Sequence, residues 1–343
     1  MAADRARSRR RAKVIIVPLV GVAISLIAIA LAIRGIDLSR TVEILTAVRP
    51  WPLAIVALAL VVQLWVRSLR WAQLLPDGPA GRIPTRRLVP VVLVGYLGNA
   101  VLPARLGDPI RAVLVGRRES VPASSAFGSV VLERVIDTLM LALIVVPATV
   151  LSGGPGQLVG AAAIAAFVAG LVLIVAQTPF PMRLVVRLKS RTGERGTAML
   201  ESVARFVAAL DARGRRRAVA SVAGLSLVGW LLDGTIYWAA GLALGIDLGL
   251  AGAMLVSAIT VLGTAIPSAP GYVGTFELAA TTVAVALGVP PEQALAFAIL
   301  VHALTVLSLA VGGAISLVWM GARFSELATT AGLSADRSGT AVR

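Results

Sequence analysis

The sequence contains no cysteine and a single histidine, His302. Without cysteine, these residues form no disulfide bond, no thiolate metal site and no cysteine nucleophile. Charged residues are also scarce, at 14% of the 343 positions, whereas hydrophobic residues make up 58%. This balance lies far outside the range of soluble globular proteins, and it predicts a polytopic membrane protein.

Enzymatic sequence motifs are missing as well. The sequence has no Walker loop, no dinucleotide-binding glycine loop, no H-E-x-x-H zinc motif and no Ser/His/Asp arrangement. We therefore expect no catalytic residue, no metal and no cofactor, and we interpret the chain as a protein that is not an enzyme.

Acidic residues are few beside the basic ones, 17 against 32, which gives a net charge of +15. The basic residues cluster between apolar stretches, at residues 5–13, 67–87 and 183–217. This placement is typical of cytoplasmic loops beside anionic lipid and disfavours a nucleic-acid partner. Almost all basic residues are arginine, which, with the abundance of Ala, Val and Gly, is typical of GC-rich bacterial genomes. We therefore expect the inner membrane of a bacterium.

Six stretches are long and apolar enough to cross a bilayer. The first has 20 uncharged residues, which span about 30 Å as a helix, and it is interpreted as an uncleaved membrane helix. Two further apolar segments, residues 88–116 and 248–287, are broken by glycine and proline. The prediction is an all-α membrane protein with about six full transmembrane helices and two broken or re-entrant segments, hence eight or more membrane segments. The six stretches are residues 14–33, 52–69, 124–150, 157–177, 218–244 and 293–320.

Each predicted half, residues 14–150 and 157–320, holds three full crossings if its broken segment returns to its own side. Because three is odd, the second half would enter the membrane from the opposite face to the first. The halves would then form an inverted-topology repeat with both termini in the cytoplasm. The alternative, that a broken segment makes two complete spans, leaves this parity unchanged.

The flanking regions complete the expected domain organisation. Residues 1–13 form a basic cytoplasmic N-terminus, residues 14–322 form the transmembrane domain, and residues 323–343 form a disordered cytoplasmic tail. The cytoplasmic connection 182–217 carries Met199, Val203, Phe206 and Leu210 at helical spacing. This pattern predicts an amphipathic helix, either at the membrane interface or as a cytosolic linker.

The two helix breaks are the strongest functional signal. A bilayer tolerates interrupted helices only where the chain faces protein or a watery cavity, so matching breaks in two halves predict a substrate site. The predicted helix-break residues are Pro103 and Gly107 in the first half and Pro267, Pro270, Gly271 and Gly274 in the second.

Arginine side chains accompany the first break. Arg105 and Arg111 flank Asp108 within a few residues, and an arginine fork matches the geometry of a phosphate group. We therefore predict that both arginines bind a lipid phosphate. The alternative is that they extend to the cytoplasmic interface and pair with Asp108.

A second charged cluster, Glu133, Arg134 and Asp137, lies inside an apolar stretch. Glu133 and Asp137 share a helix face and would repel each other unless a cation or a proton lies between them. If the cation is an arginine, the residues form a charge network that opens when a phosphate competes for the arginine. If a carboxylate is protonated instead, transport would be coupled to a proton gradient. A purely structural network is the third possibility.

The second break precedes a helix expected to begin near Thr275. The amide groups at such a helix start form an anion site, to which Ser268 and Thr275 add hydroxyl groups. Glu277 is either a favourable charge in the first helical turn or a carboxylate that faces the first cluster. His302 is interpreted as a packed, hydrogen-bonded histidine rather than a proton carrier.

Other polar residues in or near apolar spans have simpler interpretations. Asp233 is a further candidate for the cavity because it lies within a predicted span. Arg67, Arg70, Trp65 and Trp71 close the second predicted span and are interpreted as membrane-interface anchors.

At these motifs the sequence resembles the flippase-like transmembrane domain of the lysylphosphatidylglycerol synthase (multiple peptide resistance factor) family. Two positions depart from the family pattern: Asp108 stands where Glu is more common, and Tyr272 where Gly is frequent. The resemblance rests on Asn99, Pro103, Arg105, Gly107 and Arg111, on Glu133, Arg134 and Asp137, and on Pro267, Pro270, Gly271, Gly274 and Glu277.

Full synthases carry a C-terminal aminoacyl-transferase domain, and this sequence stops about twenty residues after its last predicted helix. The resemblance therefore implies a stand-alone lipid flippase or scramblase that moves an anionic phospholipid, a glycolipid or a polyprenyl phosphate. The predicted phosphate-binding residues are Arg105, Arg111, Asn99, Ser268 and Thr275, and the predicted charge network is Asp108, Glu133, Arg134, Asp137 and Glu277.

Two other functions remain open at this point. One is a membrane enzyme that acts on a lipid or polyprenyl phosphate with Glu133 or Asp137 as general base. The other is an anchor or regulator of a cytosolic lipid-modifying or glycosyl-transferring enzyme, which would bind the basic connection. A homo-oligomer or such an enzyme is the expected protein partner.

Overall fold

The computed structural model describes residues 19–102, 106–157, 160, 164, 168, 194–210, 216–264, 266 and 268–321. The predicted N-terminus 1–13, the tail 323–343 and most of residues 157–193 lie outside this part of the chain. So do three predicted site residues, Pro103, Arg105 and Pro267.

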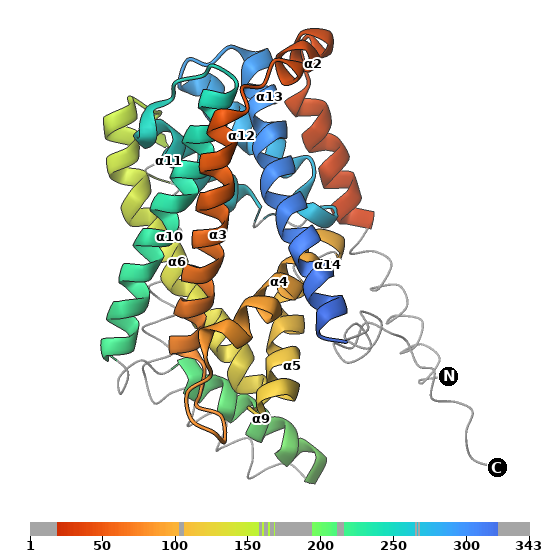
Figure 1. Ribbon diagram of the computed structural model, residues 1–343, viewed down its shortest axis with the longest axis vertical. Coiled ribbons are helices and arrows are strands. Elements are labelled where there is room, and N and C mark those ends of the chain that lie inside the picture. Colours follow the sequence, from red (N-terminus) through yellow and green to blue (C-terminus); the bar gives the residue numbers. More distant parts are fainter. Residues whose placement is uncertain are drawn as a thin grey trace, which may run out of the picture.

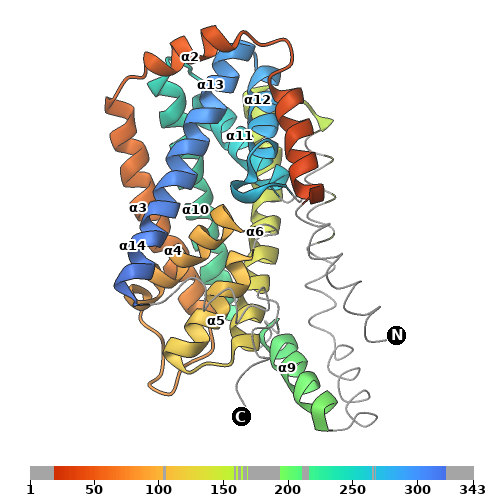
Figure 2. The same ribbon diagram turned by 90° about the vertical axis from the view of Figure 1, so that its right-hand side faces the viewer.

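Within the described residues the regular structure is helical (Figures 1 and 2). An apolar helix, Leu19–Ala32, comes first. A 3-10 turn, η3 (Pro270–Tyr272), and a π-helical turn, η4 (Ala303–Leu307), lie near the second break. The labelled α-helices are α2 (Leu38–Thr46), α3 (Trp51–Leu74), α4 (Thr85–Val101), α5 (Gly107–Glu119), α6 (Ala123–Ser152), α9 (Glu194–Leu210), α10 (Arg216–Ala243), α11 (Gly249–Gly263), α12 (Thr275–Ala286), α13 (Pro291–His302) and α14 (Ser308–Trp319).

Four helical segments among the described residues are long and apolar enough to cross a bilayer. Two shorter apolar helices, Leu19–Ala32 and Gly249–Gly263, accompany them. These segments confirm an all-helical, multi-pass membrane protein, whereas eight or more membrane segments and the inverted repeat stay predictions. The four segments are Trp51–Leu74, Ala123–Ser152, Arg217–Ala243 and Pro291–Trp319.

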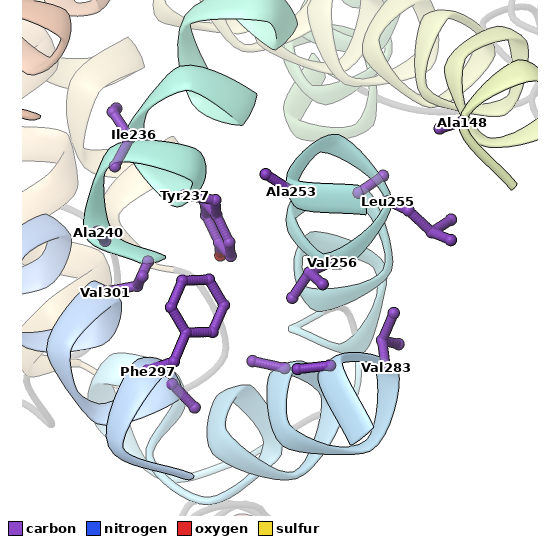
Figure 3. Packing of buried hydrophobic residues seen from close by; sticks show 14 of the residues in the cluster. Ala148, Ile236, Tyr237, Ala240, Ala253, Leu255, Val256, Val283, Phe297 and Val301 are labelled. Atoms are coloured by element: carbon purple, nitrogen blue, oxygen red, sulfur yellow. The ribbon is translucent and has the colours of Figure 1, made fainter. Parts of the chain in front are cut away.

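The long helices α3 and α10 pack side by side, and α6 lies against α11 (Figure 1). Many of the buried residues at these contacts are alanines, and such small residues let helices approach closely in a membrane. Aromatic rings fill the remaining space. Tyr237 of α10 and Phe297 of α13 point toward each other, with ring centroids 6.0 Å apart (Figure 3). Val256 of α11 and Val283 of α12 belong to the same buried cluster, so four helices share one core.

The first break joins α4 to α5 by a close helix contact. The Asn99 side-chain oxygen accepts a hydrogen bond from the Gly107 amide at 2.9 Å. A Cβ atom built on Gly98 would lie 2.8 Å from the Cα atom of Gly107, and one on Gly107 would overlap the Gly95 carbonyl oxygen. Only glycine therefore fits at this contact.

The substitution Gly107→Ala is expected to destabilise the protein by at least about 2 kcal/mol, because the added methyl group meets rigid backbone rather than a movable side chain. Thermal unfolding in detergent measures the effect. The matched control is Gly224→Ala in α10, where nothing lies within 4 Å of the added Cβ atom. Equal unfolding temperatures for the two variants would contradict this account of the contact.

The second break runs from the end of α11 to the start of α12 and lies against the first helix. Ser25 donates a hydrogen bond to the Val273 carbonyl oxygen at 2.7 Å and accepts one from the Ala269 amide at 2.8 Å. Tyr272 has a φ of +63°, a left-handed conformation that costs a residue with a side chain about 1 kcal/mol or more. Glycine would adopt this conformation freely, so the tyrosine carries a backbone cost that glycine would avoid.

Helix α9 covers the predicted amphipathic segment and packs on α6. The rings of Phe206 and Phe127 stack with centroids 5.8 Å apart, and Arg205 donates to the Ser124 hydroxyl at 3.4 Å. The helical prediction is thus confirmed for residues 194–210. Met199 stays exposed, and its placement at a membrane surface stays a prediction.

Candidate functional site

Arg70 lies at the centre of a buried charge cluster between α3, α6 and α10. Its guanidinium group contacts the Glu133 carboxylate at 2.6 Å and the Asp137 carboxylate at 2.5 Å. It also donates to the Ser226 hydroxyl at 3.0 Å. Only 7% of the Arg70 side chain is exposed. Arg70 is therefore the cation that allows two carboxylates to share one face of α6.

The interpretation of Arg70 and Trp71 as membrane-interface anchors was wrong. Trp71 is fully buried, and its indole N–H donates to the Ser129 hydroxyl at 3.0 Å. Trp65 is exposed, as an anchor would be. An arginine at the end of an apolar run normally faces the interface, and the sequence does not show that α6 and α10 cover this end of α3.

Arg111 extends the cluster from α5. Its guanidinium contacts the second oxygen of Glu133 at 2.6 Å and lies over the Trp71 ring, 4.8 Å from the centroid. The side chain is buried in these contacts. Arg111, a predicted phosphate-binding residue, therefore holds Glu133 in place and is not among the residues that line the cavity between the two breaks.

Arg134 forms a two-pronged contact with the Asp108 carboxylate, at 3.0 and 3.2 Å. Arg111 lies 3.5 Å from the same carboxylate. The Arg134 side chain is 38% exposed, unlike Arg70 and Arg111. The predicted network residues Asp108, Glu133, Arg134 and Asp137 thus lie together, and Arg134 is the member that faces open space.

This space is a cavity of about 160 Å³ between the two breaks. Asn99 and Ala100 border it from the end of α4, and Gly271 and Tyr272 border it from the second break. Its remaining walls come from α3, α6, α10, α11, α12, the π-helical turn η4 and α14. The polar or ionisable side chains that line it are those of Gln63, Arg67, Tyr96, Asn99, Arg134, Asp233, Tyr237, Thr264, Tyr272 and Thr305.

Asp233 contributes a carboxylate to the cavity wall. It accepts hydrogen bonds from Gln63 at 2.6 Å and from Ser257 at 2.7 Å. The Arg67 guanidinium lies 3.6 Å from it and also donates to the Tyr96 hydroxyl. Arg67 is 26% exposed, so it is a second guanidinium group within reach of a ligand.

Sequence reasoning missed Gln63 and Ser257, and it assigned Arg67 to the interface. A signal was present on α3, because Gln63, Arg67 and Arg70 recur at intervals of four and three residues and so share one helix face. This face points inward, toward Asp233 and Glu133.

The predicted residues of the second break have other partners. The Thr275 hydroxyl donates to the Tyr272 carbonyl oxygen at 3.1 Å, and the buried Ser268 hydroxyl has no partner among the described residues. Glu277 accepts the Gly274 amide at 2.7 Å in a capping box at the start of α12. Its other oxygen pairs with His302, so Glu277 does not join the first cluster.

In the part of the chain that the structure describes, no three acidic or histidine side chains gather as a metal site would require. The cavity instead combines apolar walls with two guanidinium groups, each held by a carboxylate. Such a site can accept an anion when the anion takes the place of the carboxylate at the arginine fork.

A family model described as the lysylphosphatidylglycerol synthase TM region matches residues 19–313, most of the chain. Glycosyltransferase AglD of Haloferax volcanii is 30% identical over 350 aligned positions, which cover 92% of this chain and 55% of that protein. A UPF0104 membrane protein of Methanothermobacter thermautotrophicus is 24% identical over an alignment that covers 76% of this chain and 82% of that protein. The chain thus spans about half the length of the first relative.

Proposed function

Because this chain belongs to the lysylphosphatidylglycerol synthase transmembrane-region family, we propose that it moves a phosphate-bearing polar lipid between the two leaflets as a flippase or scramblase. One observation carries the proposal. Arg67 and Arg134 line the same cavity between the two helix breaks, and each is held by a single carboxylate, Asp233 or Asp108.

The division of roles follows from burial. Arg70 and Arg111 are enclosed and hold Glu133 from both sides, so they form the fixed support. Arg67 and Arg134 are partly exposed and can exchange a carboxylate for a lipid phosphate at little desolvation cost, because both states are paired. In this proposal they take the phosphate-binding role that the sequence suggested for Arg111, and Arg105 remains a candidate beside them.

The inverted repeat is part of the same proposal. The end of α4 packs on η3, and a Cβ atom on Gly271 would lie 3.4 Å from the Ala100 carbonyl oxygen, so the two breaks are in contact. A cavity at the meeting point of two broken helices is the arrangement expected of transporters with related halves. We place both termini in the cytoplasm of a bacterial cell on the basis of the positively charged loops.

The name of the Haloferax volcanii relative, glycosyltransferase AglD, favours one class of lipid as the cargo. Since that protein is described as a glycosyltransferase, we propose a role in lipid-linked glycosylation, with a sugar-bearing lipid phosphate as the cargo. The chain covers 55% of that relative, so the sugar-transfer activity in its name is not carried over to this chain, and the proposal concerns the lipid alone.

Reconstituted liposomes test this function. Purified protein is expected to move acyl-chain-labelled phosphatidylglycerol or a glycosylated polyprenyl phosphate at least about tenfold faster than a neutral glycolipid without phosphate, because the arginine forks bind only the anionic headgroups. Protection of the label from a membrane-impermeant quencher measures the movement. No movement of any lipid by folded, inserted protein would overturn the proposal.

A further inference from the structure

The two nitrogens of the only histidine ring have different partners. The Nε2 atom of His302 lies 2.7 Å from the Gly271 carbonyl oxygen, and Nδ1 contacts a carboxylate oxygen of Glu277. A carbonyl oxygen only accepts hydrogen bonds, so Nε2 carries a hydrogen. Nδ1 and the carboxylate are both acceptors in their unprotonated forms. Their contact therefore requires one additional proton, on the ring or on the carboxyl group.

Among the described residues, no fixed cation pairs with this carboxylate in place of that proton. Glu277 contributes its second oxygen to the Gly274 amide, and the first helix, Leu19–Ala32, has no ionisable side chain. In the same part of the chain, Tyr272 in the break and Tyr237 on α10 bring phenol groups to the hydrophobic cluster that contains Phe276. Across the cavity lie Arg67 and Arg134, which have carboxylate partners of their own.

The acidic pair on α6 differs in this respect. Glu133 and Asp137 could each have held a proton to relieve their repulsion, but Arg70 already supplies the positive charge between them. The contact between Glu277 and His302 thus requires a proton, whereas the contact between Glu133 and Asp137 does not.

This contact is connected to the cavity wall. The His302 ring stacks on Phe276, with centroids 4.3 Å apart and planes inclined by 13°. Phe276, Gly271 and Tyr272 all line the cavity. Directly after His302 comes the π-helical turn η4, which contributes Thr305 to the same wall, and such turns are frequent at functional sites.

Tyr272, whose backbone is strained, lies in the sequence between Gly271, which His302 contacts, and Gly274, whose amide is bound by Glu277. Loss of the proton would place a carboxylate against a ring lone pair and separate them. The break would then be free to relax, and the wall formed by Tyr272 and Phe276 would move.

We propose that Glu277 and His302 form the proton-binding site through which lipid movement is coupled to a proton. The inference rests on the proposed function and adds its energy source. Charge balance supports it, because the cavity arginines Arg67 and Arg134 are already matched by Asp233 and Asp108. One phosphate charge taken up with one proton keeps the loaded cavity at the net charge of the empty one.

The first test reads the proton without transport. Because His302 is the only histidine, ¹⁵N-imidazole NMR of the full chain in nanodiscs, purified without a histidine tag, reports this ring alone. We expect Nε2 to carry a hydrogen, and we expect the ¹⁵N chemical shift of Nδ1 to change when Glu277 is replaced by glutamine, because the ring then loses its carboxylate partner. The glutamine retains an acceptor for the Gly274 amide, so the helix cap is kept. An unchanged Nδ1 shift in Glu277→Gln, or an Nε2 without a hydrogen in the native protein, would overturn the proposal.

The second test measures coupling. A gradient of one pH unit across the liposome membrane is expected to shift the steady-state leaflet ratio of the transported lipid by up to about tenfold per coupled proton. His302→Gln and Glu277→Gln should abolish this shift, whereas Glu292→Gln, in the first turn of α13, should keep it. If the lipid moves but its leaflet ratio stays at one under the gradient, the coupling is disproved and the proposed function is not. If no lipid moves at all, the proposed function is disproved, and the NMR result on the proton still stands.

Discussion

Replacing Arg134 by glutamine is expected to reduce lipid translocation at least about tenfold, because a hydrogen bond to a charged group contributes roughly 1.5 to 3 kcal/mol. Folding should be retained, since Asp108 keeps Arg111 at 3.5 Å. Arg67→Gln should act in the same way, because Asp233 keeps its hydrogen bonds from Gln63 and Ser257. Initial rates of movement of a labelled lipid in liposomes, with unfolding temperatures measured in parallel, check both expectations.

The matched control is Arg87→Gln, because Arg87 is an exposed arginine paired with Glu119 at 3.3 Å and lies outside the cavity. Its variant should transport at the native rate. Arg134→Lys separates charge from shape: a lysine keeps the positive charge but lacks the planar fork, so an intermediate rate is expected. If both Arg67→Gln and Arg134→Gln transport lipid at the native rate, the cavity is not part of the transport path.

The sequence contained enough information to predict the class of fold and the location of the breaks. Apolar runs of 18 or more residues have few alternatives to membrane helices, and the Gly and Pro residues around Gly107 and Gly271 interrupt such runs. The spacing of Glu133 and Asp137 also correctly indicated that a compensating charge was needed. The identity of that charge, Arg70, depends on how α3 packs against α6, which no local pattern records.

The cavity side chains were only partly predictable for a related reason. Asp233 stood out because an acid within an apolar span is costly without partners. Gln63 and Ser257, which satisfy that acid, are uncharged and give no comparable signal. Glu277 was correctly considered as a first-turn charge, but its second partner, His302, lies 25 residues away and is brought to it only by the fold.

The largest effect on stability is expected for Arg70→Met. The substitution leaves Asp137 without its arginine and removes one of the two partners of Glu133 inside the bundle. Breaking a buried ion pair by removing one member costs about 3 to 5 kcal/mol, because the remaining charge is uncompensated. We expect a strongly lowered unfolding temperature in detergent and a large loss of monodisperse protein in size-exclusion chromatography.

The double variant Arg70→Met with Asp137→Leu decides whether the charge itself is the cause. Glu133 would retain Arg111 at 2.6 Å, so removal of Asp137 together with Arg70 leaves a balanced pair and an apolar contact. Replacement of a buried ion pair by well-packed apolar residues is often neutral or stabilising. The double variant should therefore be more stable than Arg70→Met alone, a reversal that simple loss of packing would not produce. If the double variant is less stable than Arg70→Met, the uncompensated charge of Asp137 is not the cause of the lost stability.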